Sequence, residues 1–269
     1  MNVDLGLNDL LVFLLMLTRV SGLMLLAPFF GARNLPTQVQ IALSVALAAA
    51  AFPFAPRAGV VVPTNVAALF VAAALELGVG VLLGFTANLL FGAIQLAGQI
   101  ADQELGIGLA NIIDPISNES VTIVGQLQYT LGLLFFLALD GHHLVLQAVV
   151  QSFELVPVLG LRWDAADGLA VADHLVTAVF VVGIKLSAPT LVTLMVVTVA
   201  MALLARTAPE MNIFVLGFSV RILAGLGVLA LSVPVFAHAF ASMQGQFVGG
   251  VQGGRLAGPL VDLMRALGT

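Results

Sequence analysis

DQELGIGLANIIDPISNES, residues 102–120, is the longest polar and turn-rich interruption of an otherwise apolar chain. Four of the 14 acidic residues fall within it, and none of the basic residues does. Gly106, Gly108 and Pro115 make the stretch a poor helix, because glycine adds backbone entropy and proline lacks the N–H donor. The sequence therefore predicts an acidic loop between two apolar helices.

The composition outside this loop indicates a membrane protein. Of the 269 residues, 61% are hydrophobic and only 9% are charged, whereas soluble domains carry about 25% charged residues. The mean hydropathy is +1.14. Because lipid cannot satisfy the exposed backbone of a loop, residues 102–120 are expected to lie in water or to line a cavity.

Charge and cysteine content exclude several other classes of function. The net charge is −5 and the nine basic residues are scattered singly, so no nucleic-acid surface is expected. There is no cysteine, hence no disulfide and no thiolate metal site. Asp4 and Asp9 replace the basic start of a signal peptide, so the first apolar run is expected to be a retained helix.

Apolar runs and their punctuation predict seven helices, over about residues 9–30, 37–52, 64–104, 121–139, 144–156, 170–205 and 213–236. Pro189 is expected to kink or break the sixth. Residues 161–168 form the most soluble-looking linker. Four leucines in the tail predict a short amphipathic helix after residue 255: Leu256, Leu260, Leu263 and Leu267.

A polar stripe runs along the third predicted helix into the loop. Its members are spaced seven, four and three residues apart, so they share one helix face: Asn88, Gln95, Gln99 and Asp102. One interpretation is hydrogen bonding between packed helices, and the other is a face that lines a water-filled path. Both stay open, with the path favoured because the stripe leads into the acidic loop.

Four ionisable residues interrupt apolar runs: Arg19, Glu76, Lys185 and Arg221. Each costs roughly 2.5–3.5 kcal/mol at the centre of a membrane helix on insertion scales. We therefore expect these side chains to face protein and to pair with opposite charges in this chain or in a neighbouring subunit. A structural ion pair is favoured over a role in transport.

No catalytic motif is apparent, and neither a cofactor nor a metal site is expected. His142 and His143 are adjacent, so on a helix they point about 100° apart and cannot form the i,i+4 pair of a zinc protease. There is no Gly-x-Ser-x-Gly elbow. Asp102 and Glu104 lack a third group that would orient them as an acid–base pair.

Several stretches, taken in order, resemble the FliR family of flagellar type III export-gate subunits, whose counterpart in virulence injectisomes is the SctT type. The resemblance spans about residues 10–235. It is carried by Glu76-Leu-Gly-Val-Gly80, Leu83-Gly-Phe85, Gln95 to Gln99, Gly106-Ile-Gly108, Asp114-Pro115, Asp140-Gly-His-His143, Ser152 to Pro157, Ala188-Pro189, Leu204-Ala-Arg206, Pro209-Glu-Met-Asn-Ile-Phe214 and Gly217-Phe218.

The resemblance implies an all-α integral membrane protein without enzymatic activity, located in the bacterial inner membrane at the flagellar basal body. In this family, long kinked helical hairpins assemble with FliP and FliQ copies, beside FlhB, into a helical ring around a pore. Unfolded flagellar proteins pass through that pore. Residues 1–165 are then expected to be FliP-like, and residues 166–269 to form a FliQ-like hairpin and tail.

The resemblance also implies that the loop near residues 106–120 is the plug of the closed pore. Gly106 and Gly108 would be its hinge, and the segment Ala110-Asn111-Ile112-Ile113 would block the pore beside methionines of FliP, followed by Asp114 and Pro115. A small-molecule secondary transporter subunit is the alternative, since broken helices and buried charges occur there too. We find no convincing internal repeat to favour it.

Overall fold

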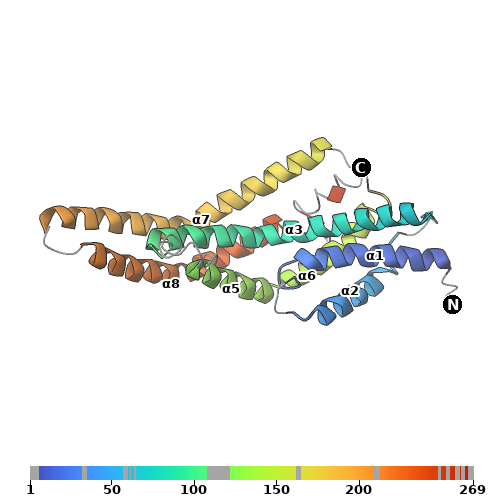
Figure 1. The fold of residues 1–269 in the computed structure, drawn as a ribbon, viewed down its shortest axis with the longest axis horizontal. Helices are drawn as coiled ribbons and strands as arrows, with labels where there is room; N and C mark the ends of the chain where they lie inside the picture. The colour runs from blue at the N-terminus through green and yellow to red at the C-terminus, as the bar shows by residue number, and fades with distance from the viewer. Residues whose placement is uncertain are drawn as a thin grey trace. The chain divides into compact units, whose positions relative to one another are not determined.

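The computed structural model describes residues 6–31, 35–56, 60, 62–63, 65–107, 122–161, 165–208, 213–247, 250–252, 255–257, 261 and 264–265. Helices account for most of these residues (Figure 1). They are α1 (Leu7–Leu26), α2 (Thr37–Ala51), α3 (Val66–Leu105), α5 (Ile123–Ala138), α6 (Gly141–Leu155), α7 (Ala165–Thr207) and α8 (Ile213–Phe247). The predicted all-helical membrane fold is confirmed in these elements.

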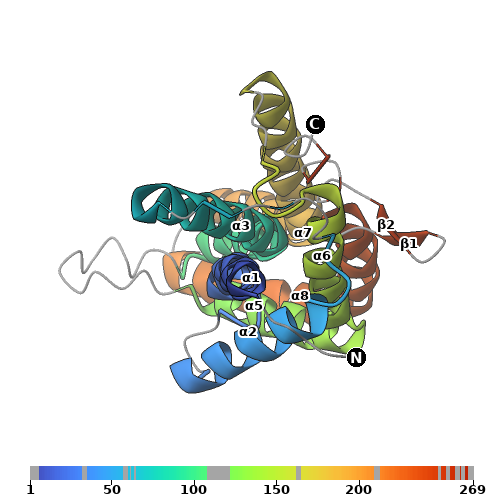
Figure 2. The same cartoon turned by 90° about the vertical axis from the view of Figure 1, so that its right-hand side faces the viewer.

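α1 and α3 pack against each other through glycine. An added Cβ on Gly84 would lie 2.6 Å from the carbonyl oxygen of Leu23, and one on Gly22 would lie 2.5 Å from that of Leu77. Gly80 meets the backbone of Arg19 in the same way. The pair of glycines four residues apart on α3 therefore lets the α1 backbone approach closely. Figure 2, which looks along α1, shows α2 on one side of it and α3 on the other.

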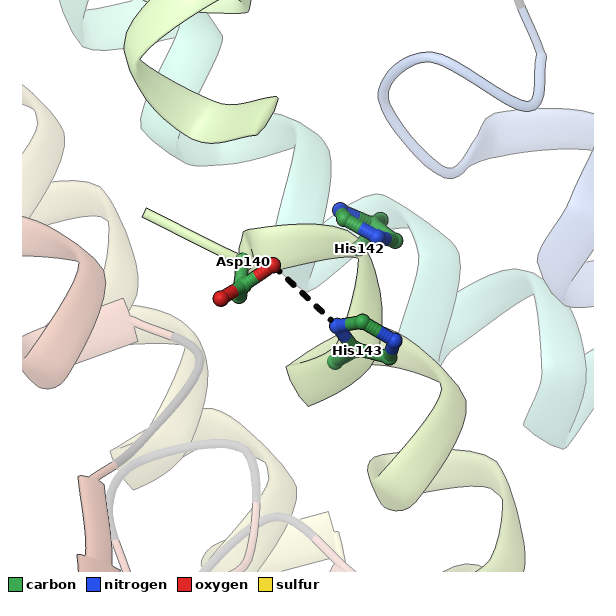
Figure 3. Close-up of side chains that lie close together, drawn as sticks. All are labelled: Asp140, His142 and His143. Carbon is green, nitrogen blue, oxygen red and sulfur yellow. Dashed lines mark hydrogen bonds and ion pairs between the residues drawn. The ribbon is translucent and has the colours of Figure 1, made fainter. Parts of the chain in front are cut away.

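α5 and α6 meet at a sharp corner, where the chain bends by 68°. Asp140 precedes α6 in a left-handed conformation (φ 56°), which aspartate tolerates better than most residues. Figure 3 shows its carboxylate beside the rings of His142 and His143. The sequence predicted a helix starting near residue 144, but α6 begins at Gly141 and includes both histidines.

Two differences from the predictions lie at the C-terminal end. Pro234 lies inside α8, which continues to Phe247 instead of ending near residue 236. In the tail, β1 (Gly250–Gln252) pairs antiparallel with β2 (Arg255–Ala257), so Leu256 belongs to a strand and not to the predicted amphipathic helix. Val261, Met264 and Arg265, further along the tail, are helical, as predicted.

The chain packs as two compact units. The first comprises residues 1–90, 136–176 and 244–269, and buries Leu15, Met16 and Leu23 of α1 together with Val149 and Phe153 of α6. The second comprises residues 91–135 and 177–243. Its core includes Ala101, Leu105, Val124 and Leu194.

Four helical segments are long and apolar enough to cross a membrane, within the described part of the chain: Leu7–Leu26, Val66–Leu105, Leu175–Thr207 and Leu216–Pro234. The bent pair α5 and α6 could count as a fifth. The 40 residues of α3 rise about 60 Å, twice the roughly 30 Å of the hydrocarbon core. Even a helix tilted by about 40°, the upper end of the usual range, would project beyond that core.

Candidate functional site

The residues of the predicted polar stripe on α3 differ in their exposure. Asn88, Gln95 and Gln99 are exposed in the isolated chain. Asp102 is 2% exposed. Three amides are therefore available to water or to another subunit, whereas the carboxylate is used inside this chain.

Asp102 anchors the start of α5. The N–H of Val124 donates to its Oδ1 at 3.0 Å, and the N–H of Gly125 donates to its Oδ2 at 3.2 Å. Both N–H groups belong to the first turn of α5, where no intrahelical acceptor exists and the helix dipole favours negative charge. A carboxylate from α3 therefore caps the helix that follows the loop.

The sequence signal for this cap is weak. Asp102 lies 22 residues before Val124 and meets it only because α3 and α5 approach closely. An added Cβ on Gly98 would lie 2.8 Å from the backbone nitrogen of Gly125, so the two helices touch backbone to backbone. Residue spacing along α3 shows which side chains share a face. It cannot show which group on a neighbouring helix a side chain such as Asp102 contacts.

A backbone hydrogen bond defines the C-terminal end of α3. Gly106 has φ 79°, a left-handed conformation that suits glycine, and its N–H donates to the carbonyl of Gln103 at 3.1 Å. It therefore ends α3. The predicted plug residues that follow lie outside the described residues: Gly108, Ala110, Asn111, Ile112, Ile113, Asp114 and Pro115.

A small polar pocket of about 130 Å³ lies between α3 and α5. Its lining is formed by Gln95, Gln99, Thr122, Gly125, Gln126 and Tyr129. Amide and hydroxyl groups of this kind are costly to leave without partners in an apolar environment. The pocket is therefore suited to hold water or to receive a polar group.

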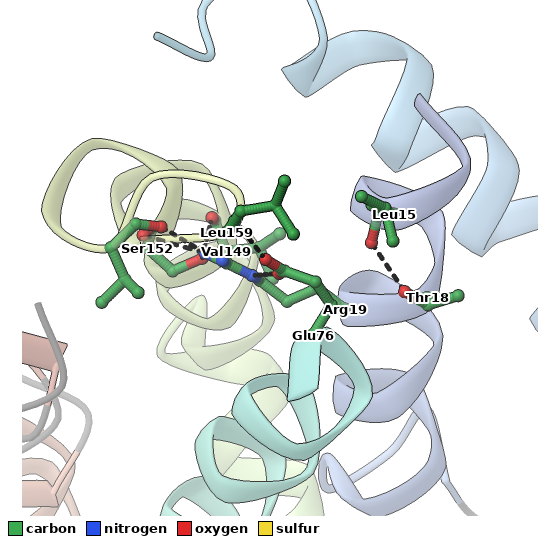
Figure 4. A network of polar contacts seen from close by, with 8 residues as sticks. Leu15, Thr18, Arg19, Glu76, Val149, Ser152 and Leu159 are labelled. Carbon is green, nitrogen blue, oxygen red and sulfur yellow. Dashed lines mark hydrogen bonds and ion pairs between the residues drawn. The ribbon is translucent and has the colours of Figure 1, made fainter. Parts of the chain in front are cut away.

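A second polar centre, in the other unit, joins α1, α3 and α6 (Figure 4). Arg19 Nε donates to Glu76 Oε2 at 2.6 Å, and both side chains are almost fully buried. Arg19 Nη1 also donates to the carbonyls of Ser152 and Val156, at 3.1 and 2.8 Å. The other carboxylate oxygen of Glu76 accepts the N–H of Leu159 at 3.0 Å. Arg19 thus provides a donor for the Val156 carbonyl at the C-cap of α6, and a second donor for the Ser152 carbonyl, which also accepts the N–H of Val156.

Lys185 and Arg221 behave differently from that pair. Lys185 is exposed, and Arg221 is half-buried with an Nε that has no hydrogen-bond partner among the described residues. Each lies within a segment long enough to span a membrane. Their predicted role in packing against other subunits stays a prediction.

Known proteins resemble this chain over most of its length. The sequence profile of the family described as "Bacterial export proteins, family 1" matches residues 10–247. The flagellar biosynthetic protein FliR of Bacillus subtilis is 31% identical over 229 residues, covering 83% of this chain and 86% of the relative. FliR of Escherichia coli is 31% identical over 223 residues, covering 82% and 84%.

A third relative, FliR of Pectobacterium carotovorum, is 29% identical over 236 residues, covering 84% of this chain and 87% of its own. None of these relatives is named as a small-molecule transporter, so that alternative has no support among them. With the family profile covering residues 10–247 and two FliR proteins above 30% identity, this chain belongs to the bacterial export protein family 1, the family of the flagellar biosynthetic protein FliR.

Proposed function

We propose that this chain is a subunit of the flagellar protein export apparatus and forms, with FliP and FliQ and beside FlhB, the inner-membrane channel for unfolded flagellar proteins. The observation that carries the proposal is the match of residues 10–247 to a family of bacterial export proteins. The relatives' names place that export in flagellar biosynthesis. The subunit has a structural and gating role and no enzymatic one.

The surfaces of α7 and α3 support assembly in a membrane complex. An exposed apolar stripe on α7 consists of Val192, Met195, Val196, Val199 and Leu203. Their spacing places them on one helix face, which must contact lipid or another apolar subunit. The length of α3 supports a complex that rises out of the hydrocarbon core. A FliP-like part over residues 1–165 and a FliQ-like part over residues 166–269 complete the proposal.

The gate of the proposed channel is the loop from Gly106 to residue 120. The Asp102 cap and the left-handed Gly106 fix the two helix ends from which this segment departs. Gln95 and Gln99 provide the hydrated wall that an aqueous path requires. Both observations support the proposed gate.

Deleting residues 111–114 tests the gate. In the assembled complex, reconstituted in a planar bilayer, the deletion is expected to raise the conductance for small ions. Unchanged conductance would remove the gate proposal and leave the family assignment intact. Co-expression tests assembly separately: the chain is expected to elute in a large complex with FliP and FliQ and to degrade when produced alone. A stable lone monomer would contradict the proposed assembly.

A further inference from the structure

We propose that Asp140, His142 and His143, at the corner between α5 and α6, form a binding site for a divalent transition metal ion of the zinc class. One potential ligand atom from each residue lies within 4.8 Å of the others. None of these residues takes part in the buried ion pair of Arg19 and Glu76, and the proposal does not rest on the export function.

The distances match the needs of such an ion. Zinc binds imidazole nitrogen and carboxylate oxygen at about 2.0–2.2 Å, which places neighbouring ligands of a tetrahedral site about 3.4 Å apart. Nδ1 of His143 already lies 3.3 Å from Oδ1 of Asp140. The third ligand needs to approach by little more than an ångström, a movement that side-chain rotation can provide. Two imidazoles with one carboxylate suit zinc, copper or nickel rather than calcium or magnesium.

The orientation of the side chains favours this use over simple helix capping. Asp140 occupies the N-cap position of α6, yet its carboxylate makes no capping hydrogen bond to the helix. It faces the histidine rings instead (Figure 3). The ring centroids of His142 and His143, both in the first turn of α6, lie only 4.2 Å apart. Nδ1 of His142 is buried and has no hydrogen-bond partner within the described residues.

Charge and access are also compatible with an ion. The dipole at the start of α6 disfavours a cation, so the carboxylate is the essential ligand and binding is expected to be reversible. The Asp140 and His143 side chains are 74% and 63% exposed. His143 also lines an open pocket of about 420 Å³, through which water can reach the fourth coordination position. The bound ion would hold the N-cap residue against the first turn of α6.

The test uses the full chain in detergent, purified through a tag without histidine and stripped with a chelator. Zinc chloride is titrated by isothermal calorimetry, and cobalt is added in a parallel sample to report coordination by visible absorption. Asp140→Asn keeps the left-handed backbone accessible, because asparagine tolerates that conformation. His143→Ala removes a nitrogen ligand. His238→Ala, at an exposed position on α8, is the matched control for adventitious histidine binding.

One zinc ion per chain is expected in the unchanged protein and in His238→Ala. Asp140→Asn and His143→Ala are each expected to weaken binding by more than about 10-fold, since loss of an outer-shell partner already costs that much. Zinc is also expected to raise the melting temperature of the unchanged protein and not of Asp140→Asn. If both ligand variants bind zinc as tightly as the unchanged protein, or if zinc does not raise the melting temperature of the unchanged protein, the proposal is overturned.

Discussion

Replacing Glu76 by glutamine leaves the charge of Arg19 buried without its counter-ion. The substitution keeps the shape of the side chain and an oxygen able to accept the N–H of Leu159, so it isolates the charge. Arg19 is 1% exposed, and its Nε lies 2.6 Å from the Glu76 carboxylate. Breaking a buried ion pair by removing one partner costs about 3–5 kcal/mol. We expect the lower end of that range.

The expected loss of stability lies at the lower end of this range because Arg19 retains other contacts. Its Nη1 still donates to the carbonyls of Ser152 and Val156, and its guanidinium carbon lies 4.6 Å from the centre of the Phe153 ring. Carbonyl dipoles and a cation–π contact partly stabilise the remaining charge. The free energy of unfolding is therefore expected to fall by about 3 kcal/mol.

Equilibrium unfolding of the full chain in detergent, followed by helical circular dichroism, measures this loss. Glu104→Gln is the matched control, because Glu104 lies on the same helix and is exposed. The double variant Arg19→Met with Glu76→Leu should be more stable than Glu76→Gln, since replacing both partners by apolar residues avoids the stranded charge. If Glu76→Gln and Glu104→Gln lower the free energy of unfolding equally, the buried charge of Arg19 does not explain the loss. The same conclusion follows if the double variant is less stable than Glu76→Gln.

Three further predictions concern the helix contacts. Gly80→Ala should lower the free energy of unfolding by about 1–3 kcal/mol, because the added methyl group overpacks against α1. Gly78→Ala should be neutral or stabilising, because the new Cβ has open space around it. Equal effects of the two substitutions in thermal melts would contradict the close packing at Gly80. Asp102→Ala should cost about 1–2 kcal/mol by removing the cap of α5, measured by chemical unfolding, and a loss below 0.5 kcal/mol would show that the cap contributes little. Lys185→Leu should leave the free energy of unfolding of the isolated chain unchanged and should reduce the amount of chain that co-purifies with the other channel subunits. Undiminished co-purification would argue against a subunit contact at Lys185.

The long helices could be predicted because their signals are local. α2 and α3 begin and end within two residues of the predicted bounds, since proline and glycine punctuate the apolar runs on either side. The four-residue spacing of Gly80 and Gly84 is typical of a close helix contact, but only the structure identifies α1 as the partner. Length and hydrophobicity were sufficient to identify membrane helices.

The partners of polar side chains could not be predicted in the same way. Arg19 meets Glu76, and Asp102 meets the start of α5, only because of which helices cross and at which residues along each helix they cross. His142 and His143 diverge on an ideal helix wheel, yet their rings lie together because side-chain torsions can turn both toward one side. Leu256 was placed in the tail helix for a related reason: its strand is set by pairing with β1, which helical periodicity does not reveal.

The export role of this chain can be tested by secretion in the native bacterium. The measurement is the amount of flagellar filament and hook protein in the culture medium of a strain from which this chain has been deleted. We expect that this strain secretes no flagellar protein and that the intact chain, supplied from a plasmid, restores secretion. Normal secretion in the deletion strain would contradict the assignment of this chain to the export channel.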